Sequence, residues 1–593
     1  MERENLWEKW MKEELKAEEA IWGVSPGLDL IPEVDLPLYN SFFLDGTHSA
    51  PPLSPLSLDL IWARGCTHGL KYVNSYFSLP TCYGWEGRAT IDGGIYWAFL
   101  IERDEKKIKE REEKFREALK PFIEDFDGMW NKIKQHITKR CEDIKTLIKN
   151  TQKNWDYAHL HWELEQFIIR DHWENHFLGM QSSYSAWILL EQECKTRFGI
   201  SDKTEDFQDM LRGFENEVYV VDKEMWLLAK EATEMGFETV FKERGLGEII
   251  KELEVSNRGK EWLKKFGEFL ERRGWRSVSF DMADPYWLEK PELALDKIKT
   301  LIVSGEAKKP EFLLEERRKE LSSKREIAVK KMLEKVPAPD RDYFQGLINL
   351  AQKASPYSEE HDLFFEMTFF AIAREGYKKI GEYLAENGAI DVPEDVFMLN
   401  GREIERCLMA PKQCDMRWIT RKRRKRWEEC KRKFAAEGEF RPPVYTTRAN
   451  LEEAVAMDLL PAFDPICIKI VVGELPEVSA EELGADLMGI CGCPGVAEGV
   501  ARVITDYSGL KELKEGEILV CPQTGPEWTI GFAIAAGVIT DRGGTLSHAA
   551  IIGREYGVPT IVNTFVATSK IKTGQRIRMD ASKGAIYILD KEK

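Results

Sequence analysis

Apolar side chains recur at intervals of three, four and seven residues through most of residues 101–435, and this spacing constrains the fold more than any other feature. Pro121 lies inside the first run and predicts a kink, because proline removes a helical hydrogen bond. Further helical patterns cover 156–195, 203–244, 257–273, 286–305, 311–336, 339–355 and 358–388. Strand-like runs are few, so residues 101–435 are predicted to form a large, mostly α domain of antiparallel helices.

Residues 1–20 have a short, charged helical pattern, and the rest of 1–100 is rich in proline, glycine and aromatic side chains, which predicts an irregular N-terminal region. Seven of its side chains form an aromatic and histidine cluster in the sequence: Trp62, His68, Tyr72, Tyr76, Tyr83, Trp85 and Tyr96. They either line a pocket or pack the region together. Packing is favoured, because aromatic side chains are core residues first.

The pattern changes again after residue 435. Residues 436–485 are interrupted by glycine and several prolines and are predicted to be a linker or hinge. Residues 486–593 then alternate short strand patterns with two helical patterns, at 526–536 and 546–556, which predicts a small α/β domain. The strand candidates are 500–504, 517–520, 538–540, 560–562, 576–580 and 585–589. The predicted fold class is therefore multidomain, with a large mostly α domain followed by a small α/β domain.

A glycine pair, two hydroxyl residues and a histidine precede the second of these helical patterns. Gly543 and Gly544 allow a tight turn with backbone N–H groups turned to an anion, and Thr545 and Ser547 add hydroxyl groups. His548 stands where the helix begins, and a helix N-terminus attracts phosphate. A neutral imidazole is a good phosphoryl acceptor. His548 is thus predicted to carry a phosphoryl group, in preference to the alternative of a structural helix cap.

Four histidines, His159, His161, His172 and His176, fall within 18 residues, beside three tryptophans that include Trp173. A metal site would use His172 and His176 with Glu165. A polar stripe without metal is favoured over that site, so no metal ligand is assigned. A third interpretation is a pocket for a small aromatic or hydroxylated molecule.

Charge and hydropathy exclude several classes of protein. The formal net charge of −17 argues against nucleic acid or an anionic membrane as the main partner, although 417–433 hold ten Lys or Arg residues. That basic run is interpreted as a solvated helix face rather than a docking site for an acidic partner. No apolar stretch is long enough to span a membrane and the N-terminus lacks a signal peptide, so a cytoplasmic protein is expected.

Three stretches of residues 485–593 carry a resemblance to a known family: Gly492–Gly499, Thr524–Thr529 and Gly543–Pro559. They resemble the swivelling phosphohistidine domain (β/β/α) of the phosphoenolpyruvate-utilising enzymes, in which the residue matching His548 is phosphorylated. Cys493 stands where a serine is usual, and Leu546 stands where the dikinases carry a regulated threonine.

The resemblance also suggests a subtype. No barrel for pyruvate follows the domain in this sequence, and residues 1–100 show no ATP-grasp pattern. The helical part is more weakly similar to the substrate domain of rifampicin phosphotransferases, and the arrangement is most similar to the larger subunit of phenylphosphate synthase. That likeness implies that a separate ATP-grasp subunit, which binds ATP with Mg²⁺ or Mn²⁺, charges His548. The acceptor it implies is phenol or a related aromatic alcohol.

The acceptor pocket is predicted around His172, His176, His361 and Trp173, with a histidine as the base that activates the hydroxyl. Two alternatives remain. One is a rifampicin-phosphotransferase-like enzyme that acts on another alcohol, and the other is a non-catalytic phosphohistidine carrier or regulatory protein.

Overall fold

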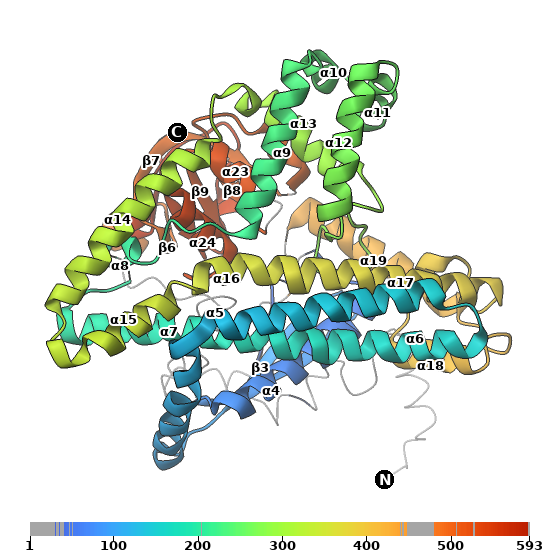
Figure 1. Cartoon of the computed structure of the whole chain (residues 1–593), viewed down its shortest axis with the longest axis horizontal. Helices are drawn as coiled ribbons and strands as arrows, with labels where there is room; N and C mark the ends of the chain where they lie inside the picture. The colour runs from blue at the N-terminus through green and yellow to red at the C-terminus, as the bar shows by residue number, and fades with distance from the viewer. Residues whose placement is uncertain are drawn as a thin grey trace, which may run out of the picture.

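The computed structural model describes residues 30, 35, 41–46, 48–49, 51–202, 204–438, 440–441, 444–446, 479–505, 507–525 and 528–590. Long helices lie side by side across the molecule, a second group of helices rises from them, and a sheet domain at the C-terminus packs between the two groups (Figure 1). The greater part of the predicted linker lies outside the described residues. Among the described helices, none is long and apolar enough to cross a membrane.

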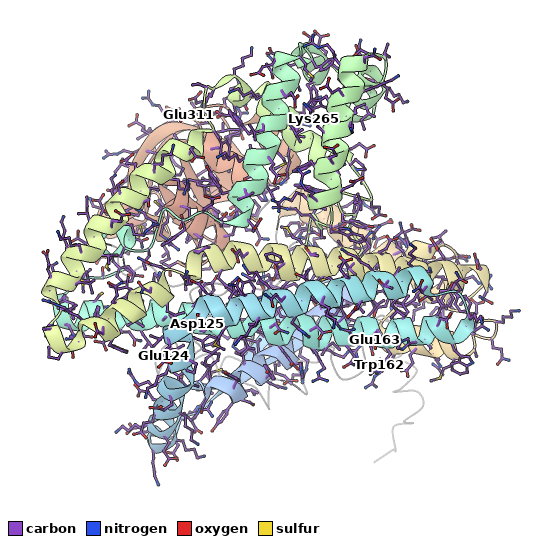
Figure 2. All side chains as sticks on the ribbon, in the orientation of Figure 1. Glu124, Asp125, Trp162, Glu163, Lys265 and Glu311 are labelled. Atoms are coloured by element: carbon purple, nitrogen blue, oxygen red, sulfur yellow. The ribbon has the colours of Figure 1, made fainter. Side chains whose placement is uncertain are left out.

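The long helices form as the apolar repeat predicts. The first, α5 (Glu105–Asn150), starts at a cap in which the Asp104 carboxylate accepts from the backbone N–H groups of Lys106 and Lys107. It bends at Asp125, four residues after Pro121, where the backbone is no longer helical (Figure 2). The kink predicted from proline is therefore present.

Two further long helices each contain a π-helical segment. One line runs through α6 (Asn154–Gln166), η2 (Phe167–His172) and α7 (Trp173–Phe198). The other runs through α16 (Ala354–His361), η5 (Asp362–Met367) and α17 (Thr368–Glu386). A π turn widens the helix by one residue and is frequent at functional sites.

Within its described residues, the N-terminal region is regular where irregular structure was expected. Three of its strands join β4, from residues 444–446, in an antiparallel sheet in the order β2-β3-β1-β4, and three helical segments accompany them. The strands are β1 (Ser41–Leu44), β2 (Cys82–Ala89), β3 (Ile95–Ile101) and β4 (Val444–Thr446), and the helices are α3 (Pro55–Ser57), η1 (Leu58–Cys66, a third π helix) and α4 (Thr67–Phe77). Its side chains share one hydrophobic core with α5, α7 and α17, so this region packs as part of the helical body.

The second helical group has its own core. It contains α9 (Glu217–Glu234), α10 (Glu238–Glu243), α11 (Leu246–Leu253), α12 (Asn257–Arg273) and α13 (Glu292–Val303). Trp226, Trp262 and Ile298 pack in the same cluster as Leu519 and Ile552 of the C-terminal domain. The helical part is thus divided into two cores, and the second is shared with that domain.

The C-terminal domain is built on a mixed eight-stranded sheet in the order β5-β12-β11-β7-β8-β9-β10-β6. Its strands are β5 (Leu487–Met488), β6 (Ile490–Cys493), β7 (Val496–Val503), β8 (Ile518–Cys521), β9 (Gly537–Thr540), β10 (Thr560–Val562), β11 (Arg576–Asp580) and β12 (Ala585–Ile588). Strands β7 to β10 are parallel neighbours, and β8, β9 and β10 are fully buried, as expected of a covered parallel sheet. Helices α23 (Thr529–Ile534) and α24 (His548–Tyr556) pack together beside it. The predicted fold class is confirmed, and the six predicted strands are present together with two that the sequence did not indicate.

The basic run forms α19 (Arg417–Glu437), and several of its cations pair with acids of the same chain. Arg423 is buried and donates to Glu403, while Arg424 binds Asp395. These ion pairs neutralise part of the positive charge of α19, which weakens its attraction for a polyanion.

Candidate functional site

His548 is delivered by a tight loop between β9 and α24. Gly543 has φ +103°, and a Cβ atom there would lie 2.6 Å from Ser547 Oγ, so only glycine fits without strain. The Ser547 hydroxyl donates to the carbonyl oxygen of Gly544 at 2.8 Å, which closes the turn. Asp541 at the start of the loop is buried and accepts from the backbone N–H of Thr568 at 3.0 Å. The loop is therefore fixed at both ends, and the helix begins at His548.

The imidazole of His548 is oriented by a hydroxyl group. Its Nδ1 lies 2.9 Å from Thr524 Oγ1, and its Nε2 is buried. Burial, together with the positive charges of Lys297 and Arg276, lowers the pKa of His548 to about 3. The ring is then neutral near pH 7 and has a nucleophilic lone pair on one nitrogen.

Arg276 and Lys297 are two buried cations that the sequence analysis missed. Both lie over the ring of Trp287, at 5.0 and 5.4 Å from its centroid. Near them burial raises the pKa of Asp222 to about 6 in spite of both positive charges. A signal was present in the sequence, because Lys297 falls on the helical face of Ala294 and Leu301, where an apolar residue is expected. Cations at this place can stabilise a phosphoryl group on His548.

The predicted phosphate-binding hydroxyls differ in their surroundings. Ser547 donates within the turn, as described above. Thr545 Oγ1 is buried and has no hydrogen-bond partner in the described part of the chain. A phosphoryl oxygen would satisfy the hydroxyl of Thr545, whereas the Ser547 hydroxyl would have to leave Gly544.

His548 borders a cavity of about 100 Å³ that the N-terminal region, the long helices and the C-terminal domain close together. The lining residues outside the C-terminal domain are Asp45, His48, Trp62, Cys66, Trp85, Trp97, Trp173, His176, Phe177, Met180, Tyr184, Phe280, His361 and Glu366. A second cavity of about 340 Å³ adjoins it and shares His48, Phe280, Glu366 and Thr524. The histidine thus faces a cavity in which most of the wall outside the C-terminal domain is aromatic.

The predicted pocket residues are brought together in part. His176, His361 and Trp173 line the cavity, and the rings of His176 and His361 have centroids 4.5 Å apart. His172 is not among the lining residues and stacks behind them on Trp173 at 4.4 Å. Glu165, considered as a metal ligand with His172 and His176, instead accepts from Arg64 at 2.8 Å.

The aromatic cluster predicted in the N-terminal region also divides. Trp62 and Trp85 line the cavity, whereas Tyr76 and Tyr83 are exposed and Tyr96 packs in a small separate core. The tryptophans near the first two histidines do not reach the cavity either. Trp155 is 80% and Trp162 54% exposed, and Figure 2 shows Trp162 on the outside of α6.

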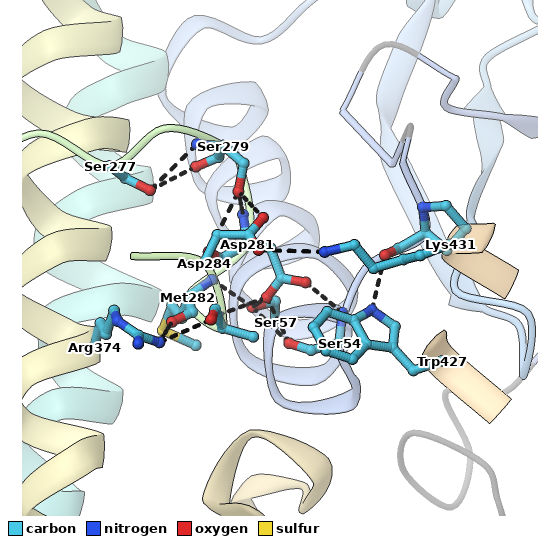
Figure 3. Close-up of polar contacts among 12 residues, drawn as sticks. Ser54, Ser57, Ser277, Ser279, Asp281, Met282, Asp284, Arg374, Trp427 and Lys431 are labelled. Atoms are coloured by element: carbon cyan, nitrogen blue, oxygen red, sulfur yellow. Dashed lines mark hydrogen bonds and ion pairs between the residues drawn. The ribbon is translucent and has the colours of Figure 1, made fainter. Parts of the chain in front are cut away.

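A loop before α13 holds the cavity wall in place (Figure 3). The buried Asp281 carboxylate accepts from the hydroxyls of Ser54 and Ser57 at 2.6 and 2.7 Å. On the other side of the loop, Arg374 of α17 donates to the carbonyl oxygen of Met282 at 3.0 Å. Phe280 directly precedes these two anchored residues, and its ring packs edge-on against His48 in the cavity wall.

In addition to the shared core, polar contacts and close packing join the C-terminal domain to the rest of the described structure. The Glu555 carboxylate on α24 accepts from the backbone N–H groups of Gly213 and Phe214, at 2.8 and 2.7 Å. The Arg542 guanidinium lies so close to Gly46 that a Cβ atom on Gly46 would overlap it. These contacts hold His548 against the cavity.

Two parts of the chain match family models of known proteins. Residues 513–584 match the family described as PEP-utilising enzyme, mobile domain, and residues 175–359 match the fourth domain of rifampicin phosphotransferase. An uncharacterised phosphotransferase of Bacillus subtilis, YvkC, is 32% identical over 393 residues, which are 65% of this chain and 43% of that protein.

Two further relatives match shorter parts. Rifampicin phosphotransferase of Streptomyces sviceus is 29% identical over 332 residues, 54% of this chain and 34% of that protein. Phosphoenolpyruvate synthase of Pyrococcus furiosus is 42% identical over 107 residues, 18% of this chain and 13% of that protein. The chain therefore spans less than half the length of each of these relatives.

Proposed function

We propose that this chain, which belongs to the phosphoenolpyruvate-utilising enzyme family through its mobile domain, is the carrier and acceptor-binding part of a phosphotransferase. In this proposal His548 receives a phosphoryl group that originates in ATP and passes it to the hydroxyl of phenol or a similar aromatic alcohol. The observation that carries the proposal is the position of His548 at an aromatic-lined cavity.

The residues around His548 suit such a transfer. Thr524 contacts Nδ1, so the lone pair of Nε2 attacks phosphorus and the bond to the donor's leaving group breaks. In the second step the acceptor oxygen attacks phosphorus, the P–N bond breaks and its electron pair returns to Nε2. The acceptor loses its proton to a base. A phenolic hydroxyl with a pKa near 10 requires that help near pH 7.

The size of the cavity favours a small acceptor. An apolar cavity of roughly 150 Å³ binds benzene, whereas sites for drug-sized ligands occupy about 300–1,000 Å³. The space beside His548 is about 100 Å³, closer to one ring than to an antibiotic. The adjoining cavity of about 340 Å³ favours the second candidate, a larger alcohol whose reacting group alone reaches His548.

The donor is proposed to lie on another protein. The described elements form the helical acceptor part and the carrier domain, and the proposal assigns ATP and its Mg²⁺ or Mn²⁺ to a separate ATP-grasp subunit. That subunit would release AMP and phosphate and place the β-phosphoryl group on His548. The proposed setting is the cytoplasm, where ATP is available.

Labelled ATP tests both steps. The chain, mixed with an ATP-grasp protein encoded beside it and β-labelled ATP, should gain an acid-labile label that the His548→Ala variant lacks. Phenol should then discharge the label into an aryl phosphate, and a panel of larger alcohols ranks the second candidate against it. Label that forms but is discharged by no alcohol would instead favour a non-catalytic carrier, and absence of any label would reject the proposal.

A further inference from the structure

We propose that His176, His361 and Glu366 bind a divalent metal ion in the cavity wall, and that its open coordination position takes the acceptor oxygen. The metal site itself concerns this chain alone, whereas its role toward the acceptor rests on the proposed function. Each of the three side chains offers a ligand atom, and these atoms all lie within 4.8 Å of one another. All three side chains are buried and line the cavity that His548 faces.

The separation of the ligand atoms is close to what an ion needs. Bonds of about 2.0–2.1 Å in a tetrahedral site set ligand atoms roughly 3.4 Å apart. Two histidines with one glutamate form the ligand set of a catalytic zinc site, in which a fourth position is open to water or substrate.

Hydrogen bonds behind the ligands already orient one of the histidines. His361 Nδ1 lies 3.1 Å from the carbonyl oxygen of Tyr357, to which it donates in the tautomer that leaves the Nε2 lone pair for a ligand. The hydroxyl of Tyr357 donates in turn to the backbone carbonyl oxygen of His176 at 2.6 Å. Tyr357 therefore links the two histidines that the ion would join.

His176 supplies an independent sign of a missing ligand. Its Nδ1 is buried and has no hydrogen-bond partner among the residues that the structure describes. A buried polar atom left in this way costs about 1–3 kcal/mol, so natural proteins rarely keep one without a use. An ion in the cluster would give the ring of His176 a partner in the cavity.

The π-helical segments explain why these residues meet. His361 and Glu366 are five residues apart, and on an α-helix of 3.6 residues per turn they would point about 140° apart. Residues 362–367 are π-helical, and a π turn places residues i and i+5 one above the other. A π segment in the neighbouring helix ends at His172, one turn before His176. Both distortions thus occur beside the proposed site.

Such an ion would make the acceptor easier to ionise. Coordination of the hydroxyl oxygen lowers its pKa, and the proton leaves to water. The oxygen then attacks the phosphorus on His548, and the P–N bond breaks as described above. The negative charge on the acceptor oxygen then has the positive charge of the ion beside it.

Metal binding can be measured without ATP, partner or acceptor. The chain is stripped with a chelator and titrated with Zn²⁺ by calorimetry, and with Co²⁺ as a spectroscopic probe of coordination number. One ion per chain is expected, with the visible bands of a four- or five-coordinate Co²⁺ site. Glu366→Gln and His361→Gln should weaken Zn²⁺ binding at least tenfold.

Matched controls come from a pair outside the cluster. His68 Nε2 lies 2.8 Å from Glu174 Oε1, and neither residue lines the cavity. Glu174→Gln and His68→Gln should leave Zn²⁺ affinity unchanged, and circular dichroism should show each variant folded. A wild-type chain that binds no ion, or Zn²⁺ affinity that the cluster variants do not alter, would overturn the metal site.

The role of the ion is tested separately from the proposed function. Label on His548 should form equally in stripped and Zn²⁺-loaded chains, and phenol should discharge it at least tenfold faster from the loaded chain. Equal rates of discharge would overturn the acceptor role. Zn²⁺ binding without any discharge would reject the proposed acceptor and leave the ion site standing.

Discussion

Lowering the pH should drive His548 out of the cavity. We call the arrangement in the structure, with His548 at the cavity, docked. In it the pKa of His548 is about 3, whereas an unperturbed histidine has a pKa of about 6.5. Each pKa unit corresponds to about 1.36 kcal/mol, so the docked site disfavours the imidazolium form by roughly 5 kcal/mol. The penalty arises from burial and from Lys297 and Arg276, and it would be absent from an arrangement in which the C-terminal domain had moved away from the cavity.

The direction follows from the lowered pKa. Above about pH 6.5 His548 is neutral in both arrangements, and docking costs nothing in protonation. Between about pH 6.5 and pH 3, the undocked imidazole binds a proton and the docked imidazole does not. At pH 5, 1.5 units below the unperturbed value, the undocked state gains about 2 kcal/mol over its position at pH 8. The ratio of undocked to docked molecules should then rise by roughly thirtyfold.

Two measurements check this prediction. Histidine labelled with carbon-13 reports each imidazole by NMR, and His548→Asn identifies the resonance, which should not titrate between pH 8 and pH 5 in the docked chain. Fluorescence energy transfer between dyes on the C-terminal domain and on α5 reports docking. The pH-dependent part of that signal should be absent from His548→Asn. A His548 resonance that titrates near pH 6.5, or an equal response in both proteins, would refute the reasoning.

Three substitutions test the surroundings of His548. Gly543→Ala places a Cβ atom against Ser547 at a positive φ, so the loop should strain by about 1–3 kcal/mol and phosphohistidine yield should fall while circular dichroism stays unchanged. Lys297→Gln removes a buried positive charge and keeps a side chain of similar volume. It should slow label transfer at least tenfold in single-turnover assays and leave the acceptor affinity unaltered. Glu555→Gln weakens the bonds to Gly213 and Phe214, and energy transfer should show docking weakened by about 1–2 kcal/mol.

Features set by local sequence could be predicted. Gly543 and the helix that starts at His548 depend on neighbours within a few residues, and the bend near Pro121 depends on one missing hydrogen bond. The apolar repeat likewise identified the long helices, because each turn of an α-helix brings the same face to the core. The two strands that were missed are short: β5 has only Leu487 and Met488, and β6 carries glycine and two cysteines rather than a β-branched run.

Features set by tertiary structure could not be predicted in the same way. Strand β1 pairs with β4, and almost the whole helical part lies between the two strands in the sequence. No local sequence pattern identifies β4 as the partner of β1. At α-helical spacing His361 and Glu366 would lie on different faces of the helix. They meet because the helix widens to a π-helix between them. Arg276 joins the site from a loop that Ser54 and Ser57 anchor through Asp281. In each case residues distant in the chain decide the geometry of the site.

The cavity beside His548 should affect the lifetime of phosphohistidine. Water competes with the acceptor for the phosphoryl group, and a space of about 100 Å³ beside His548 has room for a few water molecules when no acceptor is bound. A ring of the acceptor's size without a hydroxyl, such as fluorobenzene, would displace that water and offer no nucleophile. It should therefore lengthen the half-life of label on His548 several-fold, while phenol shortens it. The matched control is Met180→Trp, which fills the lining from α7 and should lengthen the half-life without any ligand. If fluorobenzene leaves the half-life unchanged although it binds, the water that hydrolyses phosphohistidine does not come from this cavity.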